Sequence, residues 1–241
     1  AISLLEDDSS KVRLRAVKLT GKIGGPKAGI ALHQRLGEPD DRVRREVVRN
    51  LGSIQYEPAM EDLADLVKNS DADMIRALAD AFKAYGKSGL DLIVSRYDSK
   101  GSDRAAYKDL LIAVGPEIAD SISKLLKGRS FFDNRDTFDI LRRIKNPKVA
   151  TLMLPYLADE EIAEQVVEAI RNLGKTAVEA TINSLQKQKG SGELLVTERL
   201  IRILGMLKAK SGIPILESYS QHDSERIRNA VEHSLFEIRG F

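Results

Sequence analysis

The chain has 241 residues, and its 38 basic and 36 acidic residues leave a formal net charge of only +2, which singles out no class of partner. It contains no cysteine, which excludes disulfides, thiolate zinc sites and cysteine nucleophiles and fits a cytoplasmic location. Aromatic residues make up 5% of the chain and tryptophan is absent, so an aromatic-lined ligand pocket is not expected. No apolar run approaches the roughly 18 residues of a membrane span, and we expect no insertion into membranes.

Glycine recurs along the chain at a near-constant interval, each time after the last apolar residue of a helical pattern. Successive positions lie 29 to 34 residues apart, a period typical of helical repeat arrays. Such arrays usually serve as binding surfaces. The series runs through Gly21, Gly52, Gly86, Gly115, Gly174 and Gly205, with Lys145 and Phe236 filling two gaps.

The second repeat shows the unit most clearly. Asp40 or Asp41 is a suitable helix N-cap, because its carboxylate can accept hydrogen bonds from the free amides of the first turn. Val43, Val47 and Leu51 then recur at helical spacing and predict one buried face. The glycine that follows lies where the chain can bend or a neighbouring helix can approach closely.

The same pattern, carried along the chain, gives three rows of predicted core residues. Of these 24 positions only Thr20 and Glu232 are polar, and they fall in the first and last repeats, where one face has no neighbour. In the third and sixth repeats the pattern can also be shifted by one helical turn. The rows are Ala16, Val47, Ala81, Leu110, Ile140, Ala169, Leu200 and Val231; Val17, Val48, Phe82, Leu111, Leu141, Ile170, Ile201 and Glu232; and Thr20, Leu51, Tyr85, Val114, Ile144, Leu173, Leu204 and Leu235.

Between these helices, which we call B helices, the sequence predicts a shorter apolar helix in each repeat, the A helix. Prolines lie at or near the starts of the A helices, where a missing amide is harmless. Pro155 lies inside one of them and should kink it. No alternating pattern predicts a strand. The starting prolines are Pro26, Pro58, Pro116, Pro147 and Pro214.

Val12-Arg13, Val43-Arg44 and Ile227-Arg228 stand at the same place in three B helices, and Leu51-Gly52 closes the second. These stretches resemble HEAT repeats, in the short form found in phycobilisome-lyase-like repeat proteins. The resemblance covers essentially the whole chain and implies an all-α fold, a right-handed α-α superhelix of HEAT/armadillo type with about eight helical hairpins. It also implies that B helices line the concave face. We expect one solenoid over residues 1–241, a segment of a longer chain, with repeats at roughly 1–25, 26–56, 57–87, 88–115, 116–146, 147–175, 176–210 and 211–241.

The side of the B helices opposite the core rows is predicted to be basic. The row through Arg49 holds Lys or Arg at six of eight positions, and the row through Arg42 adds more cations, such as Lys11. Near the centre, apolar side chains interrupt the cations, and an apolar centre with a charged rim is the arrangement of a binding hot spot. The predicted partner-binding residues of the concave face are Lys18, Arg42, Arg49, Arg76, Lys83, Ile112, Arg135, Phe138, Arg142, Arg171 and Arg202.

A neighbouring row of the B helices is mostly acidic. Its carboxylates lie three residues before the cations and can pair with them, which would leave a solvated face without a partner. The pairs are Glu46–Arg49, Asp80–Lys83, Asp139–Arg142 and Glu168–Arg171.

We therefore expect a non-enzymatic protein-interaction scaffold whose basic concave face binds an acidic segment of a partner. The alternative is a nucleic-acid-binding HEAT-like protein, which the acidic row and the scarcity of aromatic residues disfavour. A third reading is a phycobilin-lyase-like chromophore handler, although no chromophore-handling residue is identifiable. No catalytic residue, cofactor or metal site is predicted, because His33, His222 and His233 lack metal-ligand spacing.

Overall fold

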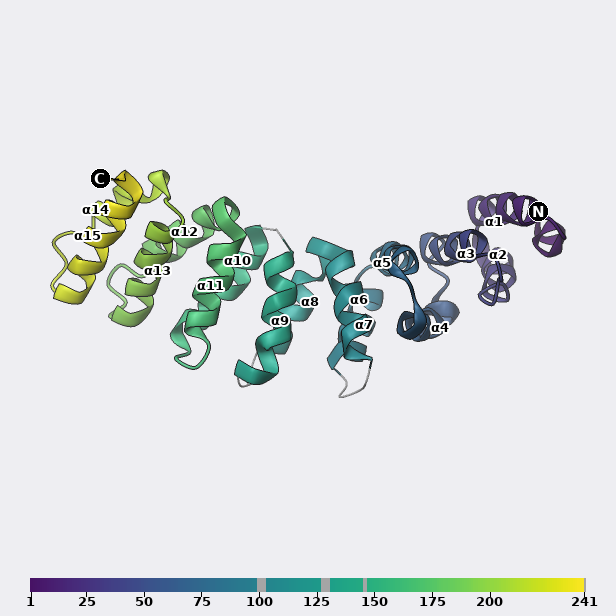
Figure 1. Cartoon of the computed structure of the whole chain (residues 1–241), viewed down its shortest axis with the longest axis horizontal. Helices are drawn as coiled ribbons and strands as arrows, with labels where there is room; N and C mark the ends of the chain where they lie inside the picture. The colour runs from purple at the N-terminus through teal and green to yellow at the C-terminus, as the bar shows by residue number, and fades with distance from the viewer. Residues whose placement is uncertain (99–102, 127–130, 145–146, 241) are drawn as a thin grey trace. The chain divides into compact units, whose positions relative to one another are not determined.

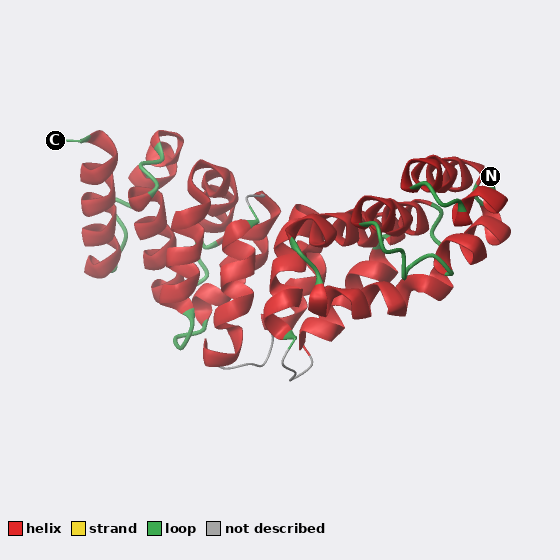
Figure 2. Ribbon diagram, turned by 45° about the vertical axis from the view of Figure 1, so that its right-hand side comes forward, coloured by secondary structure: helices red, strands yellow, loops and turns green. Residues whose placement is uncertain are grey.

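The computed structural model describes residues 1–98, 103–126, 131–144 and 147–240, and in these ranges it contains helices and no strands (Figure 2). The predicted all-α fold of HEAT/armadillo type is thereby confirmed. Contacts between the helices divide the chain into two compact units, Ala1–Ser121 and Ile122–Phe241.

The first unit is a series of helical hairpins (Figure 1). Its B helices α1, α3, α5 and α7 pack against one another in sequence, and the A helices α2, α4 and α6 lie beside them. Its elements are η1 (Ile2–Glu6), α1 (Ser10–Ile23), α2 (Gly25–His33), α3 (Asp41–Ser53), η2 (Glu57–Ala59), α4 (Met60–Leu66), η3 (Val67–Asn69), α5 (Ala72–Tyr85), α6 (Lys87–Asp98), α7 (Arg104–Val114), η4 (Gly115–Ile118) and the start of α8 (Ala119–Ser123).

The second unit repeats this arrangement, with B helices α9, α11, α13 and α15 packed in sequence and A helices α10, α12 and α14 beside them. In α10 the α-helix ends at Met153 and a 3-10 helix that contains Pro155 follows, which confirms the predicted break. Its elements are η5 (Lys124–Leu126), α9 (Phe131–Arg143), α10 (Pro147–Met153), η6 (Leu154–Ala158), α11 (Ala163–Leu173), η7 (Gly174–Ala177), α12 (Val178–Lys187), α13 (Leu194–Met206), η8 (Lys210–Gly212), α14 (Ile213–Glu217) and α15 (Glu225–Arg239).

The three predicted core rows form the interior of both units. Every member is buried except Glu232, which is exposed, and Leu235, which is half-buried. Both exceptions lie on α15, the last B helix, where no further helix of the chain covers them. Thr20, the other polar member, is buried on α1.

Three of the periodic glycines allow consecutive B helices to approach closely. A Cβ atom built on Gly52 of α3 would lie 2.3 Å from the Cα of Ala81 on α5, far inside van der Waals contact. Gly21 faces Asn50 in the same way, and a Cβ on Gly205 would lie within 2.9 Å of Ser234. In all three pairs the partner stands 29 residues after the glycine (50 − 21, 81 − 52 and 234 − 205).

The other periodic glycines end their helices instead. Gly86 has a φ of +67° and follows the last residue of α5, because a left-handed residue at this point costs glycine little. Gly115 and Gly174 end α7 and α11 with the same sign of φ. Lys145, expected to fill the place of a glycine in the fifth repeat, lies outside the described residues.

The row assignment predicted for the third repeat is wrong by one helical turn. Because Gly21 meets Asn50 and Gly52 meets Ala81, Ala81 is the equivalent of Asn50, and the step from α3 to α5 is 31 residues rather than 34. The N-cap of α5, Asp71, also lies 31 residues after the N-cap of α3.

The sixth repeat is shifted in the same sense. Asp159 accepts a hydrogen bond of 3.0 Å from the backbone N–H of Glu161, as Asp40 accepts one of 2.9 Å from Arg42. With both corrections, Asp80 and Glu168, rather than Lys83 and Arg171, stand in line with Arg49. The predicted row of cations is therefore interrupted by acids in both units.

Buried tyrosine hydroxyls join neighbouring repeats. Tyr219 donates a hydrogen bond of 2.9 Å to the carbonyl of Leu185, at the end of the preceding A helix, and Tyr85 donates one of 2.8 Å to the carbonyl of Tyr56. Burial raises the pKa of Tyr85 above its ordinary value, so this hydroxyl keeps its proton and remains a donor.

Replacing Gly52 by alanine is expected to lower the free energy of unfolding by about 2 kcal/mol. Forcing α3 and α5 apart costs about 3 kcal/mol, and the better helix propensity of alanine returns about 1 kcal/mol. Urea denaturation measures the difference. Gly37→Ala is the matched control, because a Cβ there meets nothing within 4 Å. Equal stability of the two variants would contradict the close-approach argument.

Tyr219→Phe is expected to cost about 1 kcal/mol of stability, because it leaves the buried carbonyl of Leu185 without its donor. Tyr156→Phe is the control, since the Tyr156 hydroxyl lies 3.5 Å from the Ser123 carbonyl and is only half-buried. Thermal and urea denaturation should place Tyr156→Phe closer to the wild type; the reverse order would show that the hydroxyl contacts do not join the repeats.

Candidate interaction surface

Four cations lie along one face of α1, and we call them the basic stripe: Lys11, Arg15, Lys18 and Lys22. Their spacing of four, three and four residues places them on the same side of a helix. All four are exposed, whereas the buried residues of α1 are Ala16, Val17 and Thr20, on other positions of the helix turn. The fold therefore presents the basic stripe to solvent.

The basic stripe is not neutralised by its surroundings. Over the described ranges, none of its four side chains makes an ion pair or a side-chain hydrogen bond. Arg42, at the start of the adjacent α3, is likewise exposed and without an ion pair in the same ranges. Uncompensated charges of one sign raise the local potential and attract a partner of the opposite sign.

Most of the other predicted partner-binding cations are paired with carboxylates. Of the pairs predicted within a helix, three form, and Glu46 instead accepts a hydrogen bond from Asn50. Exposed pairs of this kind contribute little to stability, but they cancel charge locally. The pairs are Arg49–Asp80 at 3.6 Å, Arg76–Asp73 at 2.7 Å, Lys83–Asp80 at 3.6 Å, Arg142–Asp139, Arg171–Glu168 at 3.2 Å and Arg202–Glu164 at 2.7 Å.

The expected apolar centre is not an exposed patch. Phe138 is only 6% exposed and belongs to the core of the second unit, so its assignment to the partner-binding face is corrected. Ile112 is half-buried on α7, in the first unit. Arg135 is exposed on α9.

A buried carboxylate anchors the helix that carries the basic stripe. Glu38, 1% exposed in the turn before α3, accepts hydrogen bonds from Arg13 on α1, the shortest of 2.7 Å, and one of 2.7 Å from Arg35. The other end of the Arg13 guanidinium donates to the carbonyls of Asp7 and Asp8, at 2.9 and 3.1 Å. Arg13 therefore serves the fold, while its neighbours on α1 face solvent.

Hydrogen bonding decides the ionisation of Glu38. Burial by itself would raise its pKa, but the hydrogen bonds from Arg13 and Arg35, together with the backbone N–H of Asp40, hold the pKa below its ordinary value. Glu38 is therefore ionised near neutral pH and stabilises both guanidinium groups.

The Val-Arg motif has the same role in the last repeat. Arg228 of α15 donates to the carbonyls of His222 and Asp223, at 2.7 and 2.8 Å, as Arg13 does to the two carbonyls before α1. The arginine of this motif closes the turn before a B helix, and so it is a structural residue.

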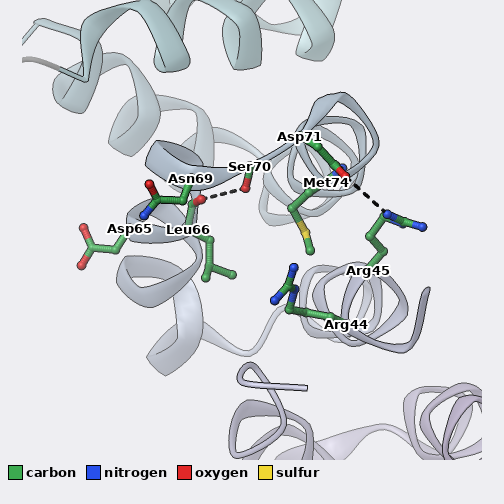
Figure 3. A pocket seen from close by; sticks show the side chains of 8 residues that line it. All are labelled: Arg44, Arg45, Asp65, Leu66, Asn69, Ser70, Asp71 and Met74. Carbon is green, nitrogen blue, oxygen red and sulfur yellow. Dashed lines mark hydrogen bonds and ion pairs between the residues drawn. The ribbon is translucent and has the colours of Figure 1, made fainter. Parts of the chain in front are cut away.

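A cavity of about 210 Å³ lies in the first unit beside α3 and the turn before α5. Figure 3 shows Met74, Leu66 and Arg44 pointing toward its centre. Its polar groups are already partnered, since Arg45 lies 3.8 Å from Asp71 and Ser70 donates to Leu66. The cavity is also smaller than the roughly 300 Å³ at which ligand pockets begin.

The histidines show no catalytic arrangement. His33 lies 2.6 Å from Asp62 on the next A helix, in an exposed pair. His222 accepts a hydrogen bond of 3.1 Å from the backbone N–H of Ser224, and so it helps to cap α15. No group of three or more potential metal ligands occurs among residues the structure describes. In the same residues, no helix has both the length and the apolar character that spanning a bilayer requires.

Sequence reasoning noticed three members of the basic stripe as parts of separate rows, because it compared helices with one another. Their spacing within α1, together with Arg15, was the signal that would have grouped them. Glu38 was missed altogether, because its partner Arg13 is 25 residues away and no local pattern joins them.

Comparison with known proteins bears on the family. Residues 1–83 match the family model described as HEAT repeats, which confirms the HEAT resemblance. No curated protein matches the chain. Its finer likeness to phycobilisome-lyase-like repeats stays a prediction.

Solved structures similar to the chain include three repeat or engineered proteins of low identity. Human deoxyhypusine hydroxylase in complex with glycerol is 17% identical, with 99% of this chain and 94% of that chain covered and a TM-score of 0.41. An engineered protein is 16% identical, with 99% and 94% covered and a TM-score of 0.31. A designed armadillo repeat protein in complex with peptide (KR)4 is 14% identical, with 98% and 97% covered and a TM-score of 0.34.

Glu38→Gln is expected to lower the free energy of unfolding at pH 7 by about 2 kcal/mol, because two guanidinium groups lose a charged acceptor. Since the folded pKa of Glu38 lies below its ordinary value, its contribution is complete above about pH 4.5 and is lost as the pH falls through the folded pKa. The difference between wild type and variant should therefore shrink on acidification, measured by urea denaturation at several pH values. Glu61→Gln, which removes an exposed pair with Arg96, is the control. A difference that is constant with pH would contradict the assignment.

Proposed function

This chain carries HEAT repeats, and we propose that it is a non-enzymatic scaffold whose basic stripe binds an acidic segment of a partner protein. Repeat folds of this kind present extended surfaces to protein and peptide partners. The observation that carries the proposal is the contrast between α1 and the later B helices. On α1 four exposed cations are unpaired within the described ranges, whereas most of the predicted cations on α5, α9, α11 and α13 each face a carboxylate within 4 Å.

The contrast narrows the surface predicted from sequence. Lys18 and Arg42 remain at its centre, and the other members of the basic stripe surround them. Arg49 extends the surface on α3, but it also lies 3.6 Å from Asp80 and is partly neutralised. An acidic segment would gain ion pairs without first displacing carboxylates that the chain supplies itself.

An acidic protein segment fits this surface better than a nucleic acid does. The neighbouring helices α3 and α5 carry Glu46, Asp73 and Asp80, which would repel a phosphate backbone that ran on from the basic stripe. Neither α1 nor α3 contains an aromatic residue on which a base could stack.

The test is charge reversal of the basic stripe, Lys11, Arg15, Lys18 and Lys22 all to Glu. A fluorescent peptide of alternating Glu and Ser, with anisotropy as the readout, is expected to bind the wild type and to lose at least about tenfold in affinity on the variant. The matched control reverses four exposed lysines of the second unit, Lys175, Lys187, Lys189 and Lys210, and so changes the net charge equally. Circular dichroism checks that both variants are folded.

Equal binding of the peptide to wild type and stripe variant would refute the proposal, as would equal losses in the two variants. Capture from a native lysate, with and without nuclease, separates the alternatives. A stripe-dependent protein that survives nuclease supports the scaffold. Capture that nuclease abolishes would assign the basic stripe to nucleic acid instead.

A further inference from the structure

The N-terminal repeat exposes apolar side chains beside the basic stripe. Leu19 and Ile23 of α1 are 50% and 68% exposed, although they lie on a regular helix of a folded unit. Ile2 and Leu4 of η1 and Ile30 of α2 are also 46 to 50% exposed. Five of the eight large apolar residues that are exposed in the described ranges thus fall within the first 30 positions.

Leu19 and Ile23 occupy the row through which each B helix packs on the helix before it. They stand 31 residues before Asn50 and Ile54 of α3 (50 − 19 and 54 − 23). Asn50 lies against Gly21 of α1, and a Cβ on Gly24 would lie 3.8 Å from Ile54. The same row on α5 and α15 supplies Ala81 and Ser234, each against a glycine of the preceding B helix. On α1 this row is ready to pack, and nothing in the described chain covers it.

We propose that α1 receives an amphipathic helix of a partner protein, with an apolar stripe bordered by acidic residues. This inference rests on the proposed function, and it specifies the form of the acidic segment. The partner helix takes the place that a preceding B helix would have, and it continues the packing seen between α1 and α3.

The charges around Leu19 and Ile23 determine which helix fits. Lys18 and Lys22 each immediately precede one of the two apolar residues, and Arg15 lies one turn before Leu19. A partner helix with Lys or Arg beside its apolar stripe would be repelled, whereas Glu or Asp would pair with the basic stripe. Specificity thus comes from the cations, and the contact area comes from the apolar pair.

The size of the partner's contacting residues is also constrained. Inside the array, close approach occurs where one of the two helices has glycine, as at Gly21 and Gly52. Leu19 is much larger than Asn50 or Ala81, so the partner needs glycine or alanine opposite it. The contact length follows from α1, whose 14 residues span about 21 Å.

The probe is a synthetic helical peptide of about 18 residues, with an Ala/Leu stripe bordered by Glu on both sides. Its control has the same composition in an order that destroys the stripe. The wild-type chain is expected to bind the amphipathic peptide at least about tenfold more tightly than the control. The double variant Leu19→Ser/Ile23→Ser should lose this preference and still bind the alternating Glu/Ser peptide. Leu194→Ser/Met206→Ser, at exposed apolar residues of the second unit, should behave as the wild type does.

The possible failures are distinguishable. If both helical-composition peptides bind alike, or if Leu19→Ser/Ile23→Ser changes nothing, this inference falls while binding of an acidic segment stands. If no acidic peptide binds the wild type, both proposals fall. Two further results overturn the helix as occupant. One is variant-sensitive binding to phosphatidylserine vesicles without a peptide preference, which assigns the row to a lipid surface. The other is variant-sensitive self-association in sedimentation, which assigns it to a second copy of the chain.

Discussion

Consecutive B helices can pack only as closely as the atoms between them allow, and glycine sets that limit at three interfaces. At Gly52 the absent side chain lets α3 approach the backbone of α5 at Ala81, and Val48 and Leu51 become fully buried as a result. The approach also fixes the rotation of each helix about its own axis. That rotation decides which residues meet water, and so the exposure of the basic stripe on α1 depends on the packing of α1 against α3 at Gly21.

The core could be predicted from the sequence because burial is periodic, and apolar residues at helical spacing have few alternatives. The rotation of α5 and α11 could not be predicted from the apolar pattern, because Tyr85-Gly86 resembles Leu51-Gly52 although it stands one turn later in its helix. The N-caps contained the answer, since the distance from Asp40 to Asp71 is the true step of 31 residues. An end of a helix is thus a better ruler than its apolar face.

The candidate surface was harder to predict, because residues of one chemical type do three different things in the first repeats. Arg13 holds a buried carboxylate, Arg49 shares an exposed one, and Lys18 meets solvent without an ion-pair partner in the described ranges. These roles depend on partners that stand 25 or 31 residues away, and a count of charges does not record them. The near-zero net charge of the chain therefore conceals a locally basic region, which becomes visible only when the carboxylates are placed.

The constant separation of 29 residues between each glycine and its partner has a consequence for how the chain folds. Every such contact closes a loop of the same moderate length, and the entropy of loop closure grows only slowly with length, so the interfaces are equally accessible to the unfolded chain. Contacts of this kind give a low contact order, which accompanies fast folding. A pair of adjacent hairpins in either unit can then act as the nucleus, and structure can spread from it one hairpin at a time.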